Sequence, residues 1–199
     1  MSGPPTNASE RVDAERFERL YEASEDPWDY RSSEYERAKY AATLAALGPG
    51  RYGRALETGC SIGVFTELLA RRCDRLVGLD FSSRALALAG ARLVGARNVE
   101  LVLGSFPEQV PAGGWDLVVC SEVLYYLDPP ALARGLDWLE AQLERGATLL
   151  IVSWRGSGET EPLRGDDVHD LLGTRLARWH AFDGRQSGYR LDRFDGHGA

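Results

Sequence analysis

The 199-residue sequence has no long apolar run and few cysteines. No apolar stretch approaches the roughly 20 residues that a membrane-spanning helix needs, and no signal-peptide pattern opens the chain. The three cysteines, Cys60, Cys73 and Cys120, are odd in number and none pair at metal-ligand spacing. We therefore expect no membrane span, no metal site and no disulfide framework, as is typical of a protein in the reducing cytoplasm.

Basic residues are too few to attract polyanions. The chain has 23 Lys and Arg against 30 Asp and Glu, for a formal net charge of −7. This balance disfavours a nucleic acid or an anionic membrane surface as a partner. A hydrophobic fraction of 44% and scattered charge are ordinary for a globular protein, and the length predicts one domain with a real core. Nothing in the sequence indicates the oligomeric state.

Residues 54–82 form the stretch around which the chain is organised. A short apolar run ends at Glu57, a turn of small residues runs over 59–63, a helical pattern follows, and a second apolar run ends at Asp80. Ligands of open α/β sheets lie beyond the carboxyl ends of the strands, where both acids are expected. Glycine in such a turn allows a ligand to approach closely, and the helix that follows directs free N–H groups toward it. The unit predicts a ligand that contains a nucleoside.

Two of the three interpretations of this unit fit less well. A dinucleotide fingerprint needs G-x-G-x-x-G, but Val64 stands where the third glycine belongs, and Glu57 would lie near an anionic pyrophosphate. A serine hydrolase is the second interpretation, because residues 59–63 match G-x-S-x-G with Ser61 as the nucleophile. Asp166 and His169 follow in the expected order, but only helical or irregular patterns precede the first strand, whereas an elbow serine normally has several strands before it.

S-adenosylmethionine is the interpretation that we prefer. Its ammonium and cationic sulfur suit Glu57, its amino-acid tail suits the turn, and its ribose hydroxyls suit Asp80. A module that binds this cofactor without catalysis stays open as an alternative. The expected contacts from the turn and the strand ends are Glu57, Gly59, Ser61, Gly63, Asp80, Phe81 and Ser121.

Residues before this unit predict a helical lid. We expect disorder over residues 1–12, then helices over 13–23 and 34–47. Trp28 is expected to cover the cofactor together with Tyr30, and Arg37 or Lys39 to hold its carboxylate. Alternatively, the aromatic side chains only pack the two helices onto the sheet.

Residues after this unit continue the alternation of strands and helices. Ser82 is expected to cap the next helix. The strand over 99–103 leads to Ser105 and Phe106, which we expect to bind adenine, Phe106 by stacking. The other expected elements are helices over 82–94, 131–143 and 165–172, and strands over 115–120, 148–154, 174–183 and 188–194, the last two an antiparallel pair.

Three residues are candidates for the catalytic groups. Glu122 and Tyr125 follow the buried strand over 115–120, and either could orient an acceptor, although Glu122 could instead only stabilise the N-terminus of a short helix. His169 is the third candidate, because a histidine side chain can take a proton from an amine or a hydroxyl. A structural, hydrogen-bonded histidine is the alternative.

The pattern E-x-G-x-x-x-G, with an acid about 20 residues later, resembles motifs I and II of class I methyltransferases, and SEVLYYL at 121–127 resembles motif IV. Many of those enzymes have an acid where this chain has Ser105. Together with Asp26-Pro27-Trp28, ALETGCSIGVFT, GDDVHDLL and YRLDRFD, these segments resemble the nodulation protein S (NodS-like) family over nearly all the chain after residue 13.

This resemblance implies an α/β, Rossmann-like fold with a seven-stranded, mostly parallel sheet, helices on both faces and an N-terminal helical lid (residues 13–50). The cofactor-binding core would span 51–154, and a C-terminal helix and antiparallel strands 155–199. It also implies S-adenosylmethionine as the cofactor, S-adenosylhomocysteine as the product, and a small-molecule acceptor such as an amino sugar, a de-N-acetylated oligosaccharide or another small amine. A part in making a nodulation signal does not follow.

Overall fold

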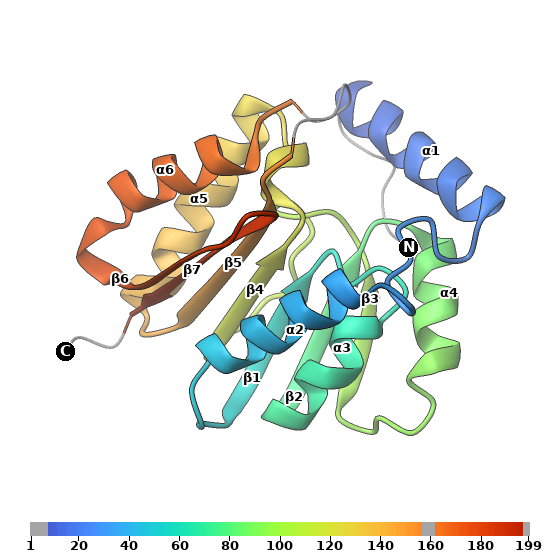
Figure 1. The fold of residues 1–199 in the computed structure, drawn as a ribbon, viewed down its shortest axis with the longest axis horizontal. Coiled ribbons are helices and arrows are strands. Elements are labelled where there is room, and N and C mark those ends of the chain that lie inside the picture. Colours follow the sequence, from blue (N-terminus) through green and yellow to red (C-terminus); the bar gives the residue numbers. More distant parts are fainter. Residues whose placement is uncertain (1–7, 157–161, 197–199) are drawn as a thin grey trace.

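Seven strands form one mixed sheet through the middle of the protein (Figure 1). The computed structural model describes residues 8–156 and 162–196. The strands are β1 (Tyr52–Thr58), β2 (Cys73–Asp80), β3 (Val99–Leu103), β4 (Leu117–Ser121), β5 (Thr148–Trp154), β6 (His180–Arg185) and β7 (Tyr189–Asp195). The α-helices are α1 (Ala8–Ala23), α2 (Glu34–Ala46), α3 (Val64–Leu69), α4 (Ser83–Arg92), α5 (Pro129–Glu144) and α6 (Gly165–Arg175).

The strand order is β3-β2-β1-β4-β5-β7-β6, and β7 is antiparallel to both of its neighbours. The strands β1 to β5 pair in parallel with one another, as the sequence predicts. The chain builds outward from β1 through β2 to β3, then returns to place β4 on the other side of β1. Such a switch point opens a crevice beyond the strand ends, where α/β proteins bind ligands.

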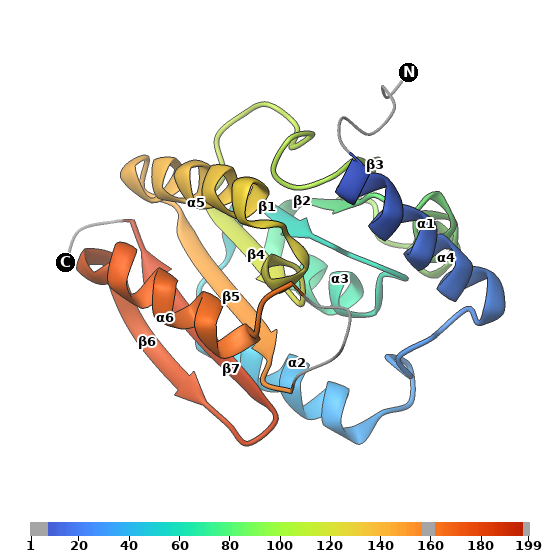
Figure 2. The ribbon, with the colours of Figure 1, turned by 90° about the horizontal axis from the view of Figure 1, so that it is seen from above.

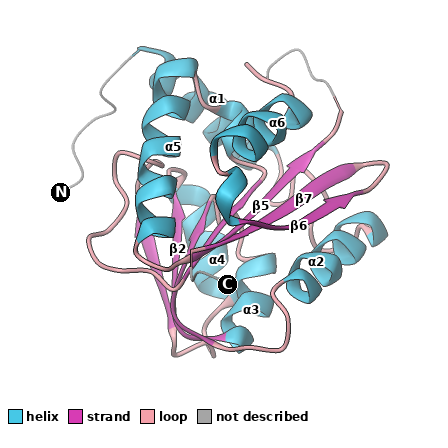
Figure 3. Ribbon diagram, turned by 90° about the vertical axis from the view of Figure 1, so that its left-hand side faces the viewer, coloured by secondary structure: helices cyan, strands magenta, loops and turns pink. Residues whose placement is uncertain are grey.

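Helices cover both faces of the sheet, which is why β4 and β5 are almost continuously apolar. One core joins the sheet to α5 and α6, and the other joins it to α2 and α3 (Figure 3). The helix α1 lies apart from these layers, beside α4 (Figure 2). No helix among residues 8–156 and 162–196 has both the length and the apolar composition to cross a bilayer.

Side-chain caps mark the first residues of α4 and α5. The Ser82 hydroxyl accepts a hydrogen bond from the Ala85 N–H at 3.0 Å and caps α4 as predicted. Asp128 caps α5 in the same way through the Ala131 N–H at 2.7 Å, with prolines in the first turn.

Two boundary predictions are wrong. The helix α1 begins at Ala8, five residues before its predicted start, so the predicted disorder does not hold from there on; residues 1–7 lie outside the described residues. The strand predicted over 174–183 begins only at His180, because α6 continues to Arg175 and a 3-10 turn follows. Leu172 and Leu176 are both fully buried one helical turn apart, and this helical spacing outweighs the alternating pattern read there.

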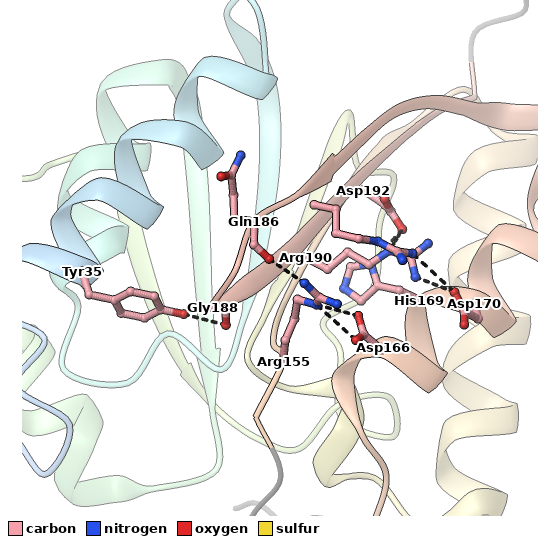
Figure 4. A network of polar contacts seen from close by, with 10 residues as sticks. Tyr35, Arg155, Asp166, His169, Asp170, Gln186, Gly188, Arg190 and Asp192 are labelled. Carbon is pink, nitrogen blue, oxygen red and sulfur yellow. Dashed lines mark hydrogen bonds and ion pairs between the residues drawn. The ribbon is translucent and has the colours of Figure 1, made fainter.

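Buried charges fasten α6 to the C-terminal hairpin (Figure 4). His169 Nδ1 lies 2.8 Å from Asp192 Oδ2, and both side chains are inaccessible to solvent. The Arg190 guanidinium lies 3.4 Å from the same Asp192 oxygen and bonds to Asp170. Removing one member of a buried ionic cluster is costly, because the remaining charge then has no partner.

We therefore expect Asp192→Ala to lower the free energy of unfolding by about 3 kcal/mol, measured by urea denaturation. The exposed Asp183→Ala on β6 is the control and should change it by less than about 0.5 kcal/mol. Equal effects of the two substitutions would contradict a structural role for this network.

Candidate active site

The turn after β1 is shaped by three alternate residues with left-handed backbone. Gly59, Ser61 and Gly63 have φ values of 67°, 50° and 77°. A Cβ built on Gly59 would lie 2.4 Å from Val123 Cγ2, so only glycine allows this close approach. The Ser61 N–H, turned by this backbone, donates to Asp80 Oδ2 at 2.8 Å. The turn thus joins the ends of β1 and β2.

Asp80 is buried at the end of β2. Its second oxygen, Oδ1, accepts the Ser82 N–H at 2.9 Å. Burial raises the pKa of Asp80 to about 6, although the Ser82 and Ser61 N–H groups oppose the shift. Each carboxylate oxygen can accept a further hydrogen bond, so Asp80 could still hold two hydroxyl groups.

A cavity of about 370 Å³, counting the part open to solvent, lies beside this turn. Its walls come from the lid segment, from the turn and from the end of β4. The lining residues are Tyr30, Glu36, Lys39, Tyr40, Glu57, Gly59, Cys60, Ser61, Ile62, Val64, Phe65, Ser121 and Glu122.

Glu57 brings a buried carboxyl group without a partner to this cavity. Its side-chain atom Oε2 has no hydrogen-bond partner among the described residues, and the residue is only 3% exposed. Burial raises the pKa of Glu57 to about 8, partly offset by the neighbouring Thr66 hydroxyl. An unpartnered buried polar atom is costly, and a cationic ligand group would satisfy it.

Glu122, which also lines the cavity, is held by three donors. Lys39 Nζ donates to its Oε1 at 2.7 Å, while the Tyr125 hydroxyl and the Trp154 N–H donate to its Oε2 at 2.7 and 2.8 Å. The backbone φ of Glu122 is 59°, an uncommon conformation for a residue other than glycine. Such strain is found mostly at functional sites.

Lys39 completes this cluster of charges. Its Nζ also donates to Glu36 Oε1 at 2.9 Å. Burial alone would lower the pKa of Lys39, but the Glu122 and Glu36 carboxylates outweigh it and raise the pKa. Lys39 is therefore a buried cation that lines the cavity.

The helix α1 crosses the ends of the strands beside the turn. The Tyr21 hydroxyl lies 2.5 Å from Ser61 Oγ, and Glu18 accepts the Ser83 N–H at 2.9 Å. Phe17 packs edge-on against Phe81, with centroids 5.4 Å apart. Trp28 packs against Phe17 and stacks on Tyr30, and it does not itself line the cavity.

Nine predicted site residues are not among those that line the cavity: Trp28, Arg37, Gly63, Asp80, Phe81, Ser105, Phe106, Tyr125 and His169. Three of them have side chains that are engaged elsewhere. The Arg37 side chain points to solvent and donates to the Ser32 carbonyl at 2.8 Å, so Lys39 is the residue that α2 directs inward. The Phe106 ring is buried against Trp138, with centroids 5.6 Å apart, and cannot stack on a base. His169 on α6 is inaccessible to solvent and is paired with Asp192 on β7, so it cannot pass a proton to or from an acceptor in the cavity.

Two other predicted residues, Tyr125 and Ser105, make contacts that differ from those predicted. Tyr125 is buried; burial and the Glu122 carboxylate raise its pKa, so it orients Glu122 by donating a hydrogen bond to it. Ser105 donates its N–H to Gln109 Oε1 at 2.9 Å and stays half-buried beside the end of β3.

The hydrolase interpretation fails on geometry. Asp166 pairs with Arg155, and His169 with Asp192, so neither assists Ser61. No histidine lines the cavity beside Ser61 among the described residues.

Sequence reasoning missed two features of the site. The Tyr21–Ser61 contact joins residues 40 positions apart and leaves no local signal. The Glu36–Lys39 pair has one, an i, i+3 spacing of opposite charges, but such pairs are ordinary on exposed helix faces.

The sheet order, the glycine turn and the acids at the ends of β1 and β2 define the Rossmann-like fold of class I S-adenosylmethionine-dependent methyltransferases. The NodS protein of Bradyrhizobium japonicum WM9, solved with S-adenosylhomocysteine, aligns with a TM-score of 0.74 and 25% identity over 90% of this chain and 96% of that one. A crystal structure from Pseudomonas syringae, described as a candidate methyltransferase, aligns at 0.71 with 39% identity over 82% and 99%.

The chain belongs to the Nodulation protein S (NodS) family, whose sequence model matches residues 13–155. Nodulation protein S of Sinorhizobium fredii is 34% identical over 56% of this chain and 52% of its own length. The Bradyrhizobium diazoefficiens protein is 35% identical over 67% and 65%. The chain thus spans about half the length of the first of these relatives and about two thirds of the second.

The pKa of Glu57 leads to a test by calorimetry. At pH 7 a carboxyl group with a pKa of about 8 is mostly protonated, whereas a bound ammonium group would favour its ionised form. Binding of S-adenosylhomocysteine should then release about 0.9 proton, measured as a dependence of the binding heat on the ionisation enthalpy of the buffer.

Glu57→Gln should reduce this proton release to nearly zero. Glu67→Gln, at a half-exposed carboxylate of α3 paired with Arg92, is the matched control and should leave it unchanged. A wild-type binding heat that is the same in all buffers would contradict the role given to Glu57.

Proposed function

We propose that this chain is an S-adenosylmethionine-dependent methyltransferase that methylates the nitrogen of a small amine, with an amino sugar as the acceptor class. The observation that carries the proposal is the buried Glu57 carboxyl group, whose Oε2 has no partner among the described residues; it lines the same cavity as Glu122, beside the glycine turn that bonds to Asp80. The match to the NodS family and to N-methyltransferase NodS supports it.

The residues around the turn and the cavity fit the cofactor. Glu57 would take its ammonium group, Lys39 its carboxylate and Asp80 its ribose hydroxyls, while the Gly59–Gly63 turn would let its chain approach the backbone. When bound, S-adenosylmethionine supplies a methyl group on a cationic sulfur, which is a good leaving group. The protein therefore needs to align the reactants more than to activate them.

Glu122 would orient the acceptor. Because Lys39, Tyr125 and the Trp154 N–H already bond to it, the carboxylate is fixed in place and charge-compensated. It can accept one further hydrogen bond at Oε1, which would direct the nitrogen lone pair of a neutral amine into the cavity. The ammonium product would then lose its proton to water, and no free base is required of the protein.

Asp80→Ala should weaken the binding of S-adenosylmethionine by at least about 100-fold, because two hydrogen bonds to a charged group contribute about 3 kcal/mol or more. Isothermal titration calorimetry would measure this, with Asp80→Asn as a variant that keeps the size of the side chain. Asp74→Ala, at the opposite end of the same strand, is the control. Unchanged affinity in a folded Asp80 variant would count against the assignment.

Transfer of a labelled methyl group to a panel of amino sugars, small amines and alcohols tests the activity itself. We expect methylated amines and S-adenosylhomocysteine as products. Tight cofactor binding without turnover across the panel would instead favour a cofactor-binding module without catalysis.

A further inference from the structure

Two half-exposed aromatic side chains lie beside Glu122, and the proposed function gives them no role. Tyr35 at the start of α2 is 40% exposed, and Trp154 at the end of β5 is 39% exposed. The Tyr35 hydroxyl donates to the Gly188 carbonyl at 2.9 Å, and the same oxygen accepts the Arg155 N–H at 3.0 Å. The Tyr35 side chain therefore ends next to the residue that follows Trp154, as Figure 4 shows for Tyr35, Gly188 and Arg155.

Both side chains lie on the α2 side of the sheet. Trp154 pairs with Tyr189 across β5 and β7, and the side chains of paired residues share a face. The Tyr189 ring contacts the Tyr35 ring edge-on at 6.1 Å and belongs to the core under α2. The Trp154 ring rests against Gly156, where a Cβ would lie 1.8 Å from the indole, so glycine allows this position.

Glu122 connects the two aromatic residues. Its Oε2 accepts the Trp154 N–H, and its Oε1 accepts Lys39 Nζ, which lies 5.2 Å from the centre of the Tyr35 ring. The Glu122 carboxylate, with acceptor capacity left at Oε1, thus contacts the backbone of Trp154 and, through Lys39, neighbours the Tyr35 ring. Half-exposed aromatic rings grouped around a fixed polar group are typical of a ligand subsite.

We propose that Tyr35 and Trp154 form the acceptor subsite, and that they select a ring with an apolar face that carries a primary amine. The inference rests on the proposed methyltransferase function and adds the residues that recognise the acceptor. The C–H face of the ligand ring would pack on an aromatic ring, and its amine would donate to Glu122. An amino sugar and a carbocyclic amine share this chemistry, whereas an acyclic amine can reach only Glu122.

The test measures equilibrium binding, so it does not depend on turnover. Ligand-observed NMR titrations, with and without S-adenosylhomocysteine, would use a glucosamine trisaccharide, cyclohexylamine and ethanolamine as probes. Trp154→Ala and Tyr35→Leu remove the rings, while Trp154→Phe and Tyr35→Phe keep an aromatic ring. Phe182→Ala removes a ring of similar exposure, 43%, from the edge strand β6 and is the control.

Loss of either ring should weaken binding of a cyclic amine about tenfold. The Phe variants and Phe182→Ala should stay near wild type, and ethanolamine binding and cofactor affinity should change less than twofold. The relative affinities of the trisaccharide and cyclohexylamine show which of the two sources of this chemistry the subsite prefers.

The proposal is overturned if the ring-removing variants bind both cyclic amines as wild type does, if wild type binds neither, or if ethanolamine binding falls equally. Failure of the proposed function would look different, because wild type would then not bind S-adenosylhomocysteine or transfer a methyl group to any acceptor.

Discussion

The buried carboxyl group of Glu57 is the constraint on which the site depends. It lies at the end of a central strand, and one of its oxygens has no hydrogen-bond partner among the described residues. Folding a carboxyl group into such a place costs free energy, and its raised pKa expresses that cost. One Glu57 oxygen therefore stays open to a cationic group of a ligand.

The backbone of the glycine turn places the Glu57 carboxyl group near Asp80. Gly59 lets the chain turn beside Val123 without collision, and the Ser61 N–H then reaches Asp80. Two acids from neighbouring parallel strands lie on either side of one glycine turn. This turn follows β1, next to the switch point where the chain crosses from one side of β1 to the other. Sheet topology and turn geometry thus act together to build a single cradle.

Glu122 differs from Glu57 in its number of partners. Three donors bond to its carboxylate and its backbone φ is positive, so its side chain is fixed in a position where it can orient a group. One of these donors comes from α2 and one from the end of β5, so this carboxylate also joins the lid segment to the sheet. Alignment is the contribution that such an arrangement can make to methyl transfer.

Much of the fold could be predicted from the sequence, because buried parallel strands are continuous apolar runs and capped helices carry local signals. The strands β3 and β5 match their predicted bounds. Glu57, Gly59, Ser61 and Ser121, predicted to contact the cofactor, line the cavity. Side-chain direction could not be predicted. Arg37 and Lys39 are two residues apart on one helix, and only packing decides that Lys39 points inward. His169 and Phe106 are buried by contacts with residues distant in the sequence.

A crystal structure of the protein soaked with S-adenosylhomocysteine would test directly whether Glu57 and Asp80 hold this ligand. We expect density across the glycine turn, with the amino group of the ligand at Glu57 and its ribose at Asp80. Density elsewhere, or a ligand that touches neither carboxylate, would contradict it.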